Sequence, residues 1–76
     1  MHMFDNIRAL TETKKEIRLS WSGKAVVLYE DQTDNGGWVL KEATGQILYS
    51  GIDAEDVLDF LSIRAKESSI EIEEDE

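Results

Sequence analysis

The sequence predicts an α+β fold: a four-stranded antiparallel β-meander with a C-terminal helix packed on one face and a short N-terminal helix. Between residues 16 and 50, short β-branched and aromatic runs alternate with glycine-containing turns, a pattern typical of β-hairpins. Residues 54–66 instead carry apolar side chains at helical spacing, directly after a good helix-capping residue. The predicted element order is therefore α-β-β-β-β-α.

Length and cysteine content limit how the core can be stabilised. The chain has 76 residues and no cysteine. A domain of this size buries only about 60% of the surface of its unfolded chain. Without disulfides or thiolate metal sites, self-association is the remaining source of support. We therefore predict one compact domain over residues 1–66 that forms a homo-oligomer, in its simplest form a dimer.

The first predicted elements are a helix over residues 4–14 and a strand over 16–21. Phe4, Ile7 and Leu10 recur at helical spacing. The helix is too short to be stable alone, so it must pack on another part of the fold. The strand alternates apolar and polar residues, as expected when one of its faces is buried.

Ser22-Gly23 is the first predicted turn. If it closes a two-residue hairpin between strands 16–21 and 24–30, Leu19 faces Val26. The apolar faces of the two strands then coincide, which supports this register.

Thr44-Gly45 is the second predicted turn, between strands 37–43 and 46–50. A two-residue hairpin here sets Glu42 opposite Ile47. One face of the pair then carries four apolar residues. They are Trp38, Leu40, Ile47 and Tyr49.

The helix over 54–66 has well-defined ends. Asp53 is a good N-cap, and Glu55 and Asp56 lie in the first turn, where the helix dipole favours anions. One stripe of the helix is apolar, so we expect it to lie across the apolar face of the meander. The stripe consists of Ala54, Val57, Leu58, Leu61 and Ala65.

The tail over residues 67–76 is mostly acidic, and we predict that it is disordered. An alternative stays open, because Ile70 and Ile72 alternate with acidic residues. In that alternative, Ser69–Glu73 pairs as an edge strand, either in this chain or on a partner.

The second face of the predicted sheet is also apolar, and one helix cannot cover both faces. Either the N-terminal helix covers this second face, or another chain does, because a bare apolar face would be unusual on a monomer. We predict this face as the oligomer interface. Its residues are Val27, Tyr29, Val39 and Leu48.

The net charge of −9 is unevenly distributed. Residues 25–63 carry one basic and eight acidic side chains, and residues 67–76 add six more acids. Direct binding to nucleic acid is disfavoured, because such binding needs a basic surface. The charge favours a basic protein partner instead. The predicted partner-binding residues are seven acids and one aromatic anchor expected at the surface: Glu30, Asp31, Asp34, Asp53, Glu55, Asp56, Asp59 and Trp38.

The loop after residue 30 resembles a calcium-binding loop in its spacing. Asp31, Thr33, Asn35, Gly36 and Glu42 occupy positions 1, 3, 5, 6 and 12 of such a loop. The flanking segments are predicted strands, however, whereas an EF-hand needs helices. The alternative is a hairpin loop that uses Asp, Asn and Gly for its turns, and we favour it and expect no metal.

No pattern of catalytic residues stands out. His2 is the only histidine, and the sequence has neither a nucleophile motif nor a phosphate-binding loop. No apolar run approaches the ~20 residues of a membrane span. The sequence thus predicts a cofactor-free, cytoplasmic, non-enzymatic binding module, an inhibitor or regulator that mimics nucleic acid, as small phage proteins do. The alternative is a homo-oligomeric assembly protein with an apolar sheet-face interface.

Overall fold

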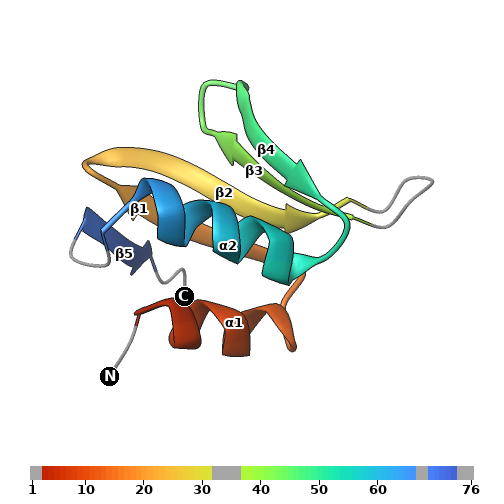
Figure 1. Cartoon of the computed structure of the whole chain (residues 1–76). Coiled ribbons are helices and arrows are strands. Elements are labelled where there is room, and N and C mark those ends of the chain that lie inside the picture. Colours follow the sequence, from red (N-terminus) through yellow and green to blue (C-terminus); the bar gives the residue numbers. More distant parts are fainter. Residues whose placement is uncertain (1–2, 32–36, 67–68, 74–76) are drawn as a thin grey trace.

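The structure is a computed structural model that describes residues 3–31, 37–66 and 69–73 (Figure 1). It confirms the α+β class and both helices, and its antiparallel sheet has five strands where four were predicted. The elements are α1 (Met3–Thr11), β1 (Glu16–Trp21), β2 (Lys24–Glu30), β3 (Trp38–Glu42), β4 (Ile47–Gly51), α2 (Ala54–Arg64) and β5 (Ile70–Glu73).

The hairpin of β1 and β2 has the predicted register. Leu19 pairs with Val26, and both side chains are buried. Ser22 and Gly23 both have positive φ, at 53° and 85°, as a two-residue turn that matches the strand twist requires. The apolar faces of the two strands therefore lie on the same side of the sheet.

The hairpin of β3 and β4 differs from the prediction. Leu40 faces Tyr49 as expected. A β-bulge follows the Leu40–Tyr49 pair, so Ile47 faces Lys41 instead of Glu42. The Glu42 N–H donates to the Gln46 carbonyl, so the connecting loop has three residues instead of two. The prediction that Leu48 lies on the second face was wrong: the bulge turns it toward the buried core.

Strand β5 is the fifth strand of the sheet and pairs antiparallel with β1, giving the order β4-β3-β2-β1-β5. The prediction of a disordered tail was therefore wrong over residues 70–73, and the edge-strand alternative is confirmed. The physical reason is burial: Ile70 is 1% exposed and Ile72 packs against the core. The rest of the predicted tail, apart from Ser69, lies outside the described residues.

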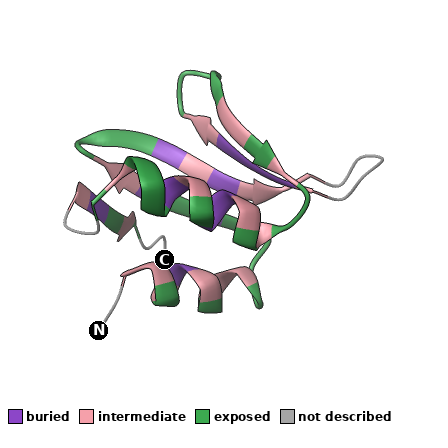
Figure 2. Ribbon diagram, in the orientation of Figure 1, coloured by how far each residue is buried: buried purple, intermediate pink, exposed green. Residues whose placement is uncertain are grey.

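Both helices lie on the same face of the sheet (Figure 1). Helix α1 packs on β1, β5 and α2, whereas α2 packs on β3 and β4. Buried residues recur along α2 and the central strands β2 and β3 (Figure 2). The N-terminal helix thus does not cover the second face, which no helix of the described chain covers.

Replacing Ile70 with Ala tests whether β5 belongs to the fold. We expect the free energy of unfolding to fall by about 3 kcal/mol, because the substitution empties a fully buried site. Urea unfolding measures the loss. Glu71→Ala is the control on the same strand, because Glu71 is exposed and its loss should cost little. Equal losses for the two variants would contradict the docking of β5.

Candidate protein-binding surface

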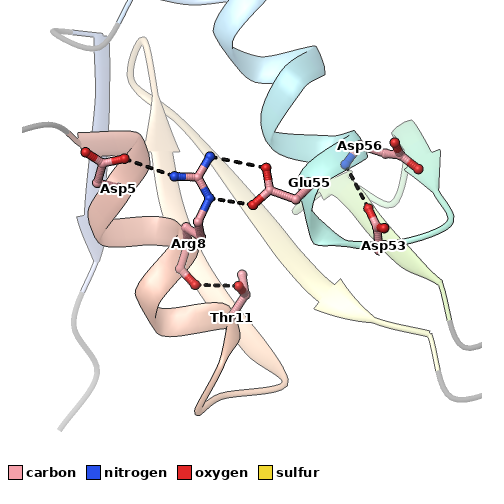
Figure 3. A network of polar contacts seen from close by, with 6 residues as sticks. All are labelled: Asp5, Arg8, Thr11, Asp53, Glu55 and Asp56. Atoms are coloured by element: carbon pink, nitrogen blue, oxygen red, sulfur yellow. Dashed lines mark hydrogen bonds and ion pairs between the residues drawn. The ribbon is translucent and has the colours of Figure 1, made fainter.

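Asp53 and Asp56 join the end of β4 to the start of α2 (Figure 3). The Asp53 carboxylate accepts a hydrogen bond from the Asp56 N–H at 3.1 Å, the arrangement of an N-cap. The Asp56 carboxylate accepts one from the Ile52 N–H at 3.0 Å. The two predicted site residues therefore have defined positions, and each carboxylate keeps further acceptor capacity.

Glu55 connects the two helices through Arg8 of α1 (Figure 3). Arg8 donates from Nε and Nη2 to the Glu55 carboxylate, the second bond at 3.2 Å, and from Nη1 to Asp5 at 3.0 Å. The hydrogen bond to Glu55 and the negative charge of Glu55 raise the pKa of Arg8. Arg8 therefore stays cationic, and half of the charge that Glu55 and Asp5 bring is neutralised.

Glu30 and Asp31 lie at the end of β2. Glu30 pairs with Lys15, with Oε1 and Nζ 2.8 Å apart. The Asp31 N–H donates to the Gly37 carbonyl at 2.6 Å, which begins to close the β2–β3 connection. Gly37 lies so close to Gly51 that an added Cβ would collide with the Gly51 carbonyl.

This glycine contact brings the acids of β2 and α2 to one end of the molecule. A Cβ on Gly51 would in turn collide with Asp56, so Asp31, Gly37, Gly51 and Asp56 form a continuous chain of contacts. Asp59 follows Asp56 one helical turn later. We call the six carboxylates of this region the acidic end. They are Glu30, Asp31, Asp53, Glu55, Asp56 and Asp59.

Two predicted binding residues do not add to the acidic end. Trp38 was expected at the surface, but it is 8% exposed and belongs to the core, because its strand position faces the helices. Asp34 lies outside the described residues. Asp31 and Glu42 lie near opposite ends of the β2–β3 ladder, roughly 17 Å apart at strand spacing, so they cannot share a calcium ion.

The structure places only some residues of the predicted oligomer interface on one face of the sheet. Val27, Tyr29 and Val39 share the sheet face opposite the helices, which we call the open sheet face. Lys41 lies on the same face, with Nζ 5.5 Å from the centroid of the Tyr29 ring. Arg18 lies beside Val27 there as well. This face is therefore a mixture of apolar and charged side chains.

The sequence patterns did not reveal two features of the surface. The Arg8–Glu55 pair joins residues 47 positions apart, and no local pattern marks it. Strand β4 is an edge of the sheet, and its five residues carry no charge. The second feature is readable in the sequence once the strand order is known.

Comparisons with protein-family models, with curated proteins and with solved structures found no match. None of the helices in the described part of the chain is long and apolar enough to cross a membrane. Within residues 3–31, 37–66 and 69–73, acidic and histidine side chains form no group of three that could hold a metal ion. Functional inference therefore depends on the surface of the chain itself.

Substitutions of Asp53 separate its capping role from its charge. Asp53→Ala should lower the free energy of unfolding by about 1 kcal/mol, because the Asp56 N–H loses its acceptor. Asp53→Ser should lose much less, because serine caps helices nearly as well. Urea unfolding compares the two variants, and an equal loss would contradict the capping geometry.

Proposed function

We propose that this chain is a non-enzymatic protein-binding module whose acidic end engages a basic site on another protein. The supporting observation is the imbalance of charge there. Six carboxylates from β2, α2 and the residues beside them gather, and two of them, Glu55 and Glu30, pair with the cations Arg8 and Lys15. The excess of negative charge attracts and orients a basic partner.

The rigidity of the acidic end supports an inhibitory or regulatory role. Asp53 and Asp56 accept backbone hydrogen bonds, so their carboxylates are held before a partner arrives. Fixed carboxylates on a compact scaffold suit a groove that otherwise binds phosphates. We therefore propose a nucleic-acid-handling protein as the partner, with this chain acting as a mimic, as small phage and mobile-element proteins do. The proposed setting is the cytoplasm, since the core uses no disulfide.

An assembly protein is the second candidate function. The observation that favours it is the position of both helices on one face, which leaves the open sheet face uncovered by either helix. Val27 and Tyr29 are only half-buried there. In this candidate the acidic surface serves solubility, and self-association is the functional property.

The binding proposal is tested by removing charge from the acidic end without removing the cap. The test variant carries Asp31→Asn, Asp53→Asn and Asp59→Asn, because asparagine still caps a helix. The immobilised chain first captures its partner from a lysate at low ionic strength, and titration calorimetry then measures the affinity. We expect a ~10-fold or greater loss of affinity, as three exposed ion pairs allow.

The matched control removes the same charge elsewhere, through Glu42→Gln, Glu71→Gln and Glu73→Gln, and should keep its affinity. Wild-type binding should weaken steeply with salt, and duplex nucleic acid should compete for the partner. Equal losses in both variants, or binding that salt does not change, would overturn the proposal.

A further inference from the structure

The two edge strands of the sheet differ in how they are protected. Strand β5 carries the exposed acids Glu71 and Glu73, which oppose pairing with another strand. Strand β4, at the other edge, reads Ile-Leu-Tyr-Ser-Gly and has neither charge nor proline. Its bulge is confined to Leu48, and Tyr49, Ser50 and Gly51 keep the regular pairing of the ladder, so this is the edge at which a further strand can add.

Exposed apolar side chains surround this same strand. In the described part of the chain, the large apolar residues that stand exposed are Ile47 at 59%, Ile52 at 82% and Ile63 at 80%. Ile47 begins β4, and Ile52 follows its last residue. Ile63 lies on α2 and lines a hollow together with Tyr49 of β4. Three separate positions thus place apolar surface around one edge.

The outer side of α2 completes this surface and carries opposite charges at its two ends. Asp56, Asp59 and Arg64 line the hollow beside Tyr49. Phe60 stacks on Tyr49 at its centre, with ring centroids 4.5 Å apart. The Arg64 guanidinium carbon lies 5.3 Å from the centroid of the Phe60 ring. The surface is acidic toward the start of α2, aromatic in the middle and basic toward its end.

We infer that a second copy of this chain binds here, with its β4 antiparallel to the first β4. A two-fold axis at the Tyr49–Phe60 stack reverses the direction of strand and helix together. Ile47 of one copy then faces Gly51 of the other and lies next to Ile52, because Ile47 and Gly51 are each two residues from Tyr49. Arg64 of one copy lies beside Asp56 of the other, because each is four residues from Phe60.

Charge complementarity selects the second copy over other occupants. A basic segment would suit Asp56 and Asp59 but would place a cation against Arg64. An acidic segment would suit Arg64 but would place an anion against Asp56 and Asp59. An antiparallel second copy satisfies both ends at once, and it does so twice in the dimer. The inference does not depend on the proposed basic partner: Asp56 and Asp59 are shared between the two surfaces, whereas Glu30, Asp31, Asp53 and Glu55 lie outside this pairing.

Sedimentation velocity over a range of concentrations tests the dimer. The wild-type chain should dimerise reversibly. Ile63→Glu should raise the dissociation constant ~100-fold, because the loss of one buried isoleucine is worth about tenfold and occurs twice. Arg64→Glu should weaken the dimer too, because it places like charges beside Asp56. Both side chains are exposed, so urea unfolding should find both variants folded.

Val27→Lys is the matched control on the open sheet face, and it should leave the dissociation constant unchanged. A strictly monomeric wild-type chain would overturn the inference. So would a dimer that Val27→Lys breaks and Ile63→Glu leaves intact. Capture of a basic partner is a separate measurement. If the chain is a monomer that still binds its partner, only the dimer is contradicted. If the chain is a dimer that binds no basic partner, only the proposed function is contradicted.

Discussion

One apolar layer, buried between two helices and a single face of the sheet, holds every element of this fold. Ile7 of α1, Leu28 and Leu40 of the sheet and Leu61 of α2 are all fully buried in it. The chain has no disulfide to replace this layer. Because α1 and β5 are too short to be stable alone, each exists only where it can contribute to the layer.

That layer also determines which surfaces stay exposed. Helix α2 must cross β3 and β4, so its start lies over the sheet end where β2 stops, and carboxylates from separate segments meet there. In the same position, the outer side of α2 lies along β4, where Phe60 stacks on Tyr49. The acidic end and the β4 edge are both consequences of how the core is covered.

Local chemistry was enough to predict much of this fold. Ser22-Gly23 closed the predicted hairpin because its alternating strands permit only one register with a common apolar face. Asp53 began α2 as predicted because capping depends on nearby backbone groups. Leu48 was misplaced because it is itself the extra residue of the β-bulge, and turn composition does not specify a bulge.

The candidate site was less predictable, because it depends on contacts between distant segments. The acids could be named from the sequence, but their meeting requires the approach of Gly37 to Gly51. Trp38 lies beside a glycine-rich loop, and the sequence alone does not show whether its side chain is buried or exposed. Its burial follows only once both helices are known to lie on its side of the sheet. Likewise, the sequence around Ile70 and Ile72 is typical of an acidic tail. Their place in a strand becomes clear only when β1 is known to have an edge with which β5 can pair.

The placement of both helices on one face is the central claim, and nuclear Overhauser contacts of the Ile7 methyl groups test it most directly. The structure predicts contacts from α1 to α2 and to β5, and none to Val27 or Tyr29 on the open sheet face. Contacts from Ile7 to Val27 or Tyr29 would place α1 on the opposite face and contradict this account of the fold.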